Sequence, residues 1–307
     1  MAKLGKSGYE DFKIGLIGIG RWGKELLRNF ADLVDVPIVC HTGSPENKEW
    51  LAENYPETSV TTKPGALFAR DGIDAVAIAT PIGTHYDLVS QAIEADLDVF
   101  VEKPLAESVT RAEELRDAAA AAGVDLFVGY IYVYHPLIQP IYEAGKTDGL
   151  TKIKFTWSKL GTYQEDFLLD VVCHPISILY HHFGKEPTAI EGRSRVSFTG
   201  DRDAFSARLS FGDAQVELEL DRFNPQKHAT IVAQTSLGQT YVWTGDKLSR
   251  AGAEDHSLEV LSQDCQEPLA VECTQFLDAV VRNEPVPTNA EFGVEINRVV
   301  EQLRDGF

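Results

Sequence analysis

Three glycines near the N-terminus have the spacing of a loop that binds phosphate groups. The loop Gly18-Ile19-Gly20-Arg21-Trp22-Gly23 follows the apolar run 14–17 and precedes a stretch with helical periodicity. In a strand–loop–helix unit of this kind, the first glycine permits a tight turn and the second lets the backbone approach a pyrophosphate. The third lets the helix pack on the strand, and the helix N-terminus attracts the anion. The loop therefore predicts dinucleotide binding; glycines that serve only a tight turn are the alternative.

Polar residues also follow two later apolar runs, at positions where ligands bind in open α/β sheets. Thr80 and Pro81 come after the run 74–79, with His85 close behind, and Glu102-Lys103 comes after the run 99–101. These residues are candidates for contacts with the cofactor. On position alone, a lysine at a strand end is as readily a solvated side chain as a functional one.

The end of the second predicted strand bears on the choice between NAD and NADP. It reads Cys40-His41-Thr42-Gly43-Ser44, without the acid that usually binds the ribose 2′-hydroxyl and repels a 2′-phosphate. Thr42 and Ser44 can bind either group, and Arg21 can approach a phosphate, so both cofactors stay open. The simpler interpretation of Ser44 is an N-cap ahead of Pro45.

Strands and helices alternate over the first 130 residues. Strands are predicted at 14–17, 37–40, 59–61, 74–79, 99–101 and 126–128, and helices at about 24–33, 44–54, 84–95 and 110–123. The last helix is expected to begin in a capping box of Thr110 and Glu113 and to end at Gly123. This rhythm predicts an α/β fold with a Rossmann domain, a doubly wound parallel sheet, at residues 1–130.

The second half of the chain has a different sequence pattern. Alternating β-branched and aromatic residues predict strands at 151–159, 188–198, 204–211, 214–221, 228–233 and 239–243. They predict a C-terminal α+β domain with a large open, mostly antiparallel sheet, one face of which is solvated or paired with another subunit. Helices are expected at about 167–183, 268–282 and 290–304.

The composition excludes several classes of protein. With 47 acidic against 28 basic residues, the net charge is −19, and such a surface repels the phosphate backbone of nucleic acids. No apolar run approaches the ~20 residues that span a membrane, and the polar stretch 1–13 lacks a signal sequence. The acids are expected to form a solvated surface; adaptation to high salt is the alternative.

The spacing of the four cysteines bears on the redox state of the compartment in which the protein works. They are scattered without a C-x-x-C pair, which favours reduced thiols in the cytoplasm over disulfides or a zinc site. No metal site is expected.

Taken together, these motifs resemble the glucose–fructose oxidoreductase / inositol dehydrogenase (Gfo/Idh/MocA) family. The resemblance rests on the glycine loop, Thr80-Pro81 with His85, and the tripeptide Glu102-Lys103-Pro104. In the second half, Asp170-x-x-x-His174 followed by Leu179 and Phe183-Gly184 resembles the active-site helix of the family. Pro287-Thr288 with Gly293 resembles the stretch that returns the C-terminal helix. The tripeptide combined with the Asp–His pair is specific, and the resemblance covers nearly the whole chain.

The resemblance implies an oxidoreductase that exchanges a hydride between NAD or NADP and a secondary alcohol or ketone of a sugar, nucleotide sugar or cyclitol. It implies Lys103 as the group that stabilises the alkoxide and His174 as the general acid/base. Asp170 would orient His174 or bind a substrate hydroxyl; a spacing of four places the two on one face if the segment is helical.

A domain organisation and an assembly are also expected. Residues 131–290 would bind substrate, and residues 291–307 would return as a helix to the Rossmann domain. The large open sheet of the second domain predicts a homodimer or homotetramer formed face to face. Two alternatives stay open. One is a catalytically silent dinucleotide-binding sensor on the same scaffold, and the other is an enzyme that uses tightly held cofactor transiently.

Two departures from the family pattern affect the site. Pro175 follows the histidine where many members carry an acid, and it suits a helix start or a kink. The stretch 129–136 lacks the arginine that many members carry before the His-Pro pair. Its aromatic residues Tyr130 and Tyr132 either stack on a sugar or pack in the core.

Further polar residues precede the predicted active-site helix. They either bind substrate hydroxyls or form a solvated loop, and they are Lys159, Gln164, Glu165 and Asp166.

Overall fold

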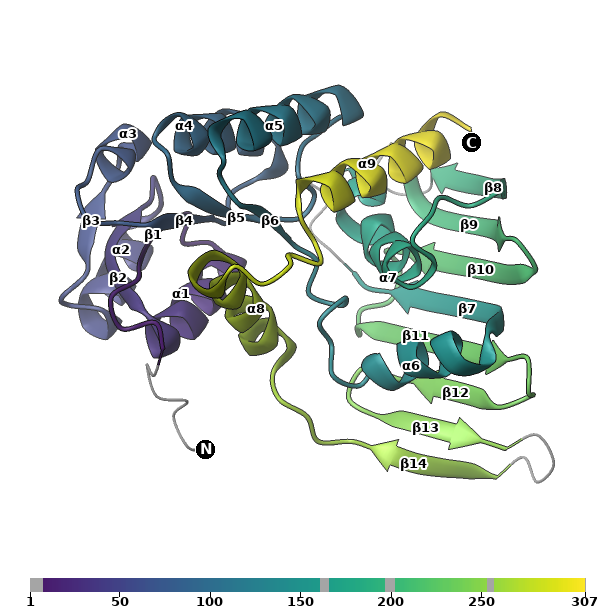
Figure 1. Cartoon of the computed structure of the whole chain (residues 1–307). Helices are drawn as coiled ribbons and strands as arrows, with labels where there is room; N and C mark the ends of the chain where they lie inside the picture. The colour runs from purple at the N-terminus through teal and green to yellow at the C-terminus, as the bar shows by residue number, and fades with distance from the viewer. Residues whose placement is uncertain (1–7, 161–165, 197–201, 253–256, 307) are drawn as a thin grey trace. The chain divides into compact units, whose positions relative to one another are not determined.

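The computed structural model describes residues 8–160, 166–196, 202–252 and 257–306. The chain forms two compact units. One comprises Met1–Tyr130 and Leu269–Asn297, and the other comprises Ile131–Pro268 and Arg298–Phe307. Each unit is built around its own sheet (Figure 1).

The first unit contains a six-stranded parallel sheet in the order β3-β2-β1-β4-β5-β6. The strands are β1 (Lys13–Ile17), β2 (Asp35–Cys40), β3 (Ser59–Thr61), β4 (Ala75–Ile78), β5 (Asp98–Glu102) and β6 (Leu126–Gly129). Every residue of β4 and β6 is buried, as expected for central strands covered on both faces. The doubly wound Rossmann sheet predicted from the sequence is confirmed.

Helices cover both faces of this sheet (Figure 1). They are α1 (Arg21–Leu33), α2 (Pro45–Asn54), α3 (Pro64–Phe68), the short η1 (Ile82–Thr84), α4 (His85–Glu94), α5 (Val109–Ala122), α8 (Pro268–Arg282) and the first part of α9 (Ala290–Asp305). In Figure 1, α4 and α5 lie on one face and α1 and α8 on the other. The short helix α3 was not predicted.

Phenyl rings join α1 and α8 to the sheet. Phe100 of β5 stacks on Phe127 of β6 with ring centroids 5.1 Å apart, and Phe276 of α8 meets each ring edge-on at 5.7 Å. Phe30 of α1 completes the group, 5.6 Å from Phe100. Because all four rings are fully buried, they fix α8 against the ends of β5 and β6.

One helix start differs from the prediction. The cap of α5 is Ser108, whose hydroxyl accepts the Arg111 N–H at 3.4 Å, and the helix begins at Val109. The predicted capping box of Thr110 and Glu113 is therefore wrong, because an earlier serine already has the cap geometry and Thr110 falls inside the first turn. The predicted end at Gly123 is confirmed by its left-handed backbone, with φ of 71°.

The second unit contains an eight-stranded sheet in the order β14-β13-β12-β11-β7-β10-β9-β8. Its strands are β7 (Leu150–Ser158), β8 (Ala189–Val196), β9 (Arg202–Phe211), β10 (Ala214–Asp221), β11 (His228–Thr235), β12 (Thr240–Trp243), β13 (Leu248–Ala251) and β14 (Leu258–Ser262). All neighbouring pairs are antiparallel except β7 and β10. The mostly antiparallel sheet is confirmed; β13 and β14 were not predicted.

One face of this sheet is apolar and carries helices. Burial alternates along β9 and β10, so that one side of each strand is buried and the other is more accessible. The helices α6 (Gln139–Asp148) and α7 (Cys173–Phe183), with the π-helical turn η2 (Leu168–Val172), lie over the sheet in Figure 1. Helix α6 was not predicted.

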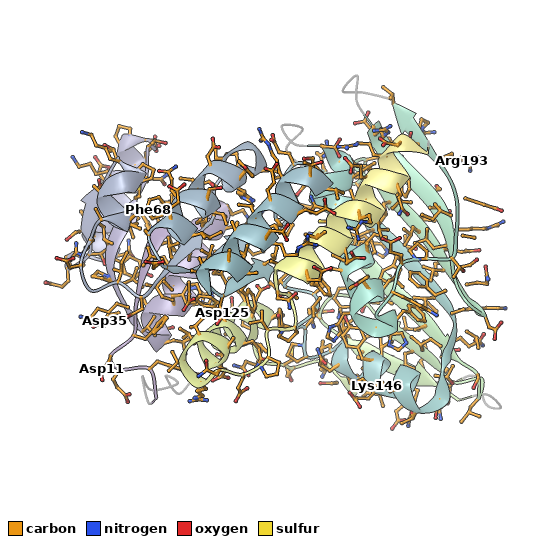
Figure 2. The ribbon with its side chains drawn as sticks, turned by 45° about the horizontal axis from the view of Figure 1, so that its top comes forward. Asp11, Asp35, Phe68, Asp125, Lys146 and Arg193 are labelled. Atoms are coloured by element: carbon orange, nitrogen blue, oxygen red, sulfur yellow. The ribbon has the colours of Figure 1, made fainter. Side chains whose placement is uncertain are left out.

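Charged side chains lie on the surface of both units. Figure 2 labels Asp35 and Asp125 at strand ends of the first unit, Lys146 on α6 and Arg193 on β8, and all four are exposed. Among the described helices, none has both the length and the apolar character needed to cross a lipid bilayer.

Candidate functional site

The glycine loop connects β1 to α1 and leaves its backbone accessible. Gly18 has φ of +98°, and its N–H donates to the Cys40 carbonyl at 2.9 Å. A side chain on Gly18 would collide with the Ala79 carbonyl, and one on Gly23 would collide with the Gly18 carbonyl oxygen. Both glycines are thus required by the fold of the loop itself.

Gly20 is different, because the loop does not need it for packing. Among the described residues, no atom lies within 4 Å of the place where its Cβ would stand. Gly20 is the N-cap of α1 and has ordinary backbone angles, φ −75° and ψ −166°. The bare backbone at the start of the helix, next to the exposed Arg21 and Trp22, fits the pyrophosphate of a dinucleotide.

The end of β2 carries short polar side chains. Thr42 is exposed, and Ser44 is the N-cap of α2, as predicted, with its carbonyl accepting the Asn47 N–H at 3.1 Å. The Ser44 hydroxyl forms no capping hydrogen bond. Since His41 is buried with Nδ1 accepting the Gly43 N–H at 3.1 Å, the accessible groups here are the two hydroxyls.

His85 joins the loops that follow β4 and β5. Its Nε2 lies 2.9 Å from the Thr80 carbonyl, and its Nδ1 lies 2.9 Å from the carbonyl of Pro104, the residue after Lys103. The ring is fully buried, and this burial lowers the pKa of His85. His85 therefore connects the backbone of the two loops.

Glu102 and Lys103 end β5, each partly buried. Burial raises the pKa of the Glu102 carboxyl, while the Lys103 ammonium and the Lys103 backbone N–H act to lower it. The Lys103 ammonium therefore opposes the effect of burial on the Glu102 carboxyl at the end of β5.

In the second unit, Asp170 and His174 lie on one continuous helical segment. Asp170 belongs to the π-helical turn η2, and His174 is the second residue of α7, which follows directly. Pro175 has no N–H to donate to Val171, and a proline within an α-helix crowds the preceding turn; the wider π-turn relieves this. Turns of this kind are frequent at functional sites.

Aromatic rings surround His174. The Tyr132 ring meets the imidazole edge-on at 4.9 Å, and the Trp157 indole is stacked with it at 5.8 Å. Trp243 lies 5.9 Å from Tyr132. His174 therefore sits in an apolar setting in which Trp157 and Trp243 are buried, while Tyr132 and His174 itself stay partly accessible.

A lysine completes this aromatic group. Lys227, in the loop between β10 and β11, donates from Nζ to the Tyr132 hydroxyl at 3.0 Å. Lys227, Trp157 and Trp243 could not be found from local sequence patterns, because strand pairing brings them to His174 and Tyr132. The alternation along β7 and β12 identifies the tryptophans only as inward-facing residues.

The structure separates the predicted substrate residues. Tyr132 lies against His174, and Lys159 is exposed at the end of β7. Asp166 caps η2, since its Oδ1 accepts the N–H groups of Leu168 at 2.8 Å and Leu169 at 3.1 Å. Gln164 and Glu165 lie outside the described residues.

Tyr130 requires a correction. Its ring is fully buried in the first unit, 5.5 Å from Phe292, so it has no surface to offer a sugar. Of the two interpretations of the aromatic stretch, core packing holds for Tyr130.

The candidate residues thus fall into two groups. The glycine loop, Thr80, His85, Glu102 and Lys103 belong to the first unit, and Tyr132, Asp170 and His174 belong to the second. In the described parts of the chain, no three His, Cys, Asp or Glu side chains cluster as a metal site would require.

Comparison with known proteins identifies relatives of both halves. Residues 12–130 match the family model GFO_IDH_MocA, described as an oxidoreductase family with an NAD-binding Rossmann fold. The chain is 23% identical to UDP-N-acetylglucosamine 3-dehydrogenase of Acidithiobacillus ferrooxidans, over 95% of this chain and 96% of that protein. It is 26% identical to the NAD-dependent scyllo-inositol 2-dehydrogenase of Bacillus subtilis, over 70% and 69%.

Solved structures agree on the fold. The structure of the Acidithiobacillus ferrooxidans dehydrogenase superposes with a TM-score of 0.87 at 21% identity, covering 95% of this chain and 96% of that one. The similarity extends over both units and therefore establishes the architecture of the whole chain.

Proposed function

Because the chain belongs to the Gfo/Idh/MocA oxidoreductase family, we propose that it is an NAD(P)-dependent dehydrogenase or reductase of a sugar, nucleotide sugar or cyclitol. The reaction interconverts a secondary alcohol and the matching ketone. The observation that carries the proposal is the setting of His174, an acid/base side chain among flat aromatic rings, in a chain whose other unit has an open dinucleotide loop.

The chemistry assigns a role to each titratable residue. Oxidation of an alcohol requires a base for the hydroxyl proton and a cation that stabilises the developing alkoxide. His174 takes the proton, and the Lys103 ammonium stabilises the oxygen. The nicotinamide, when bound, accepts the hydride from carbon. Asp170 orients His174 or binds a neighbouring hydroxyl.

Aromatic and polar side chains of the second unit would hold the substrate. The Tyr132 ring offers a face for stacking, and its hydroxyl, which accepts from Lys227, keeps its own hydrogen available for a substrate oxygen. Lys159, exposed after the end of β7, would bind hydroxyl or phosphate oxygens. The two lysines favour a substrate with an anionic part, such as the diphosphate of a nucleotide sugar, over a neutral cyclitol.

The cofactor site accepts NAD and is compatible with NADP. The glycine loop binds the pyrophosphate through Gly18, Ile19, Gly20, Arg21, Trp22 and Gly23. Thr42 and Ser44 bind the ribose or its phosphate, and Thr80, Pro81 and Glu102 lie along the same edge of the sheet with Lys103.

We further propose that the protein works in the cytoplasm as a homodimer or homotetramer. None of the four cysteines forms a disulfide, and three of them are buried, as in a reducing compartment. The more accessible face of the eight-stranded sheet would form the contact between subunits. Light scattering that shows only monomer at micromolar concentration would contradict the assembly.

A substrate panel tests the proposed activity. Purified protein is mixed with nucleotide sugars, free and amino sugars, or inositols, each with NAD and with NADP, and absorbance at the reduced nicotinamide band is followed. We expect turnover with at least one member of the panel. Tight NAD binding without turnover on any of them would favour a catalytically silent sensor.

A further inference from the structure

A second carboxyl lies beside Glu102, on helix α8. Phe276 of α8 packs edge-on against Phe100 and Phe127, 5.7 Å from each, which fixes the helix over β5 and β6. Glu272 lies one helical turn before Phe276, on the same face of the helix. Glu102 lies two residues after Phe100, on the same face of β5. The aromatic contact therefore brings the two glutamates together.

The strand next to Glu102 carries a glycine at the paired position. Gly129 of β6 is paired with Glu102 and has no side chain to occupy the space beside it. A Cβ on Gly129 would lie 3.1 Å from the Phe100 ring and 3.5 Å from the Glu102 Cα. A side chain here would press on the Phe100 ring that packs against α8.

Glu272 is in a poor environment for a charge. It is 1% exposed, and among the described residues its Oε1 has no hydrogen-bond partner. Burial raises the pKa of Glu272 well above that of a free carboxyl, and the nearby Glu102 raises it further. Burial raises the pKa of Glu102 as well, but the adjacent Lys103 opposes this change. Both carboxyls therefore have raised pKa values, but only Glu102 has an adjacent cation that opposes the rise.

The other side chains described around this part of α8 are mainly apolar. The rings of Phe30, Phe100 and Phe127 pack on this part of α8 from α1, β5 and β6. The described charged group that stabilises the Glu102 carboxylate is Lys103, and the next residue of α8 is the buried thiol Cys273. The charge of the pair is thus balanced chiefly by the lysine.

We propose that Glu272 is a positioning residue for Lys103, because it shares one proton with Glu102 and so limits the pair to a single negative charge. One carboxylate holds the ammonium at the end of β5. A second would draw it toward α8 and away from a substrate oxygen. The role of the pair in catalysis rests on the proposed function, whereas the shared proton does not.

The shared proton is tested on the purified protein without substrate. Glu272→Gln retains the shape of a protonated carboxyl, and Glu291→Gln, an exposed glutamate of the same unit, is the control. We expect the infrared carbonyl band of a protonated carboxyl in the wild type at neutral pH, its loss in Glu272→Gln and its retention in the control. Absence of the band in the wild type would disprove the shared proton.

Thermal unfolding gives an independent readout. A carboxyl whose pKa is raised by folding makes the native state lose stability as pH rises above the pKa of the unfolded group, about 4.3. Glu272→Gln removes this loss, so its melting temperature relative to the wild type should increase steadily from about pH 5 to pH 8. A pH-independent difference would contradict the proposal.

Kinetics test the effect on the lysine. In Glu272→Gln a second charge cannot form, so the decline of kcat at alkaline pH should move to higher pH with KM unchanged. If Glu272→Gln loses the infrared band but its kcat has the same pH dependence as the wild type, the pair of Glu102 and Glu272 has a structural role alone. If the wild type has no turnover on any sugar, the proposed function fails while the infrared and unfolding experiments still decide the shared proton.

Discussion

The imidazole of His174 is stacked with the indole of Trp157, with ring centroids 5.8 Å apart and planes inclined by 16°. Tyr132 meets the same imidazole edge-on, at an angle of 78°. Contacts with two rings restrict the orientation of the histidine before substrate binds. A preoriented acid/base group loses less entropy in the transition state than a mobile one.

Replacement of His174 tests its role as acid/base. His174→Asn should lower kcat by about 100-fold or more, the usual contribution of a positioned acid/base group. The dissociation constant for NAD should not change, because the residue belongs to the second unit. His228→Asn, at an exposed histidine of β11, is the control and should behave as the wild type. Full turnover by His174→Asn would assign proton transfer to another group.

Two glycine variants separate cofactor binding from folding. Gly20→Ala adds a methyl group where no described protein atom lies within 4 Å, so the melting temperature should stay near that of the wild type. The same methyl group lies on the backbone proposed to approach the pyrophosphate, so NAD affinity should fall by tenfold or more, about 1.4 kcal/mol. Isothermal titration calorimetry measures the affinity.

Gly23→Ala is the matched variant, in which the added methyl group is expected to lower the thermal stability. Its methyl group would collide with the Gly18 carbonyl oxygen, so this variant should unfold at a lower temperature than Gly20→Ala. Unchanged NAD binding by Gly20→Ala would place the dinucleotide elsewhere.

The end of β2 predicts tolerance of both cofactors. Without an acid near Thr42, NAD and NADP should bind with affinities within about tenfold of each other. Thr42→Asp introduces a carboxylate that repels a 2′-phosphate, so it should weaken NADP selectively. Fluorescence titration with each reduced cofactor measures both constants. Equal weakening of NAD and NADP by Thr42→Asp would show that position 42 does not face the ribose.

The buried His135 predicts a loss of stability in acid. Its Nδ1 accepts the Leu137 N–H at 3.2 Å, and burial lowers the pKa of His135 to about 4. The folded ring stays neutral where the unfolded one, with a pKa near 6.5, takes up a proton. The free energy of unfolding therefore falls as pH drops from 6.5 toward 4, by at most about 3 kcal/mol from this group.

Denaturant titrations at several pH values measure this component. His135→Asn should flatten the decline relative to the wild type, whereas His228→Asn should leave it intact. Identical slopes for wild type and His135→Asn would show that His135 is not a source of the acid sensitivity.

The parts of the fold predicted from the sequence are those with a local physical signal. Apolar runs predicted the parallel strands, and the spacing of the glycines from Gly18 to Gly23 predicted the loop at the start of α1. Alternation of residue types along the chain predicted most strands of the second sheet. The short β14 escaped prediction because its side chains are exposed, so burial imposes no alternation on them.

In the candidate site, too, only residues with a local sequence signal could be predicted. Lys103 follows a recognisable strand, and Asp170 and His174 share a helix, so their types and spacing were informative. Trp157 and Lys227 approach His174 and Tyr132 only through the pairing of β7, β10 and β11. Tyr130 and Tyr132 are near neighbours in sequence but differ in surroundings, and no local pattern separates them.

The most direct test of the account is the turnover of Lys103→Ala. On the sugar substrate identified by the panel, kcat should fall by at least about 100-fold, because the alkoxide loses its cation. Calorimetry should show unchanged NAD binding, and Lys63→Ala, at an exposed lysine of the same unit, should keep wild-type kinetics. Near-normal turnover by Lys103→Ala on that substrate would contradict the proposed mechanism.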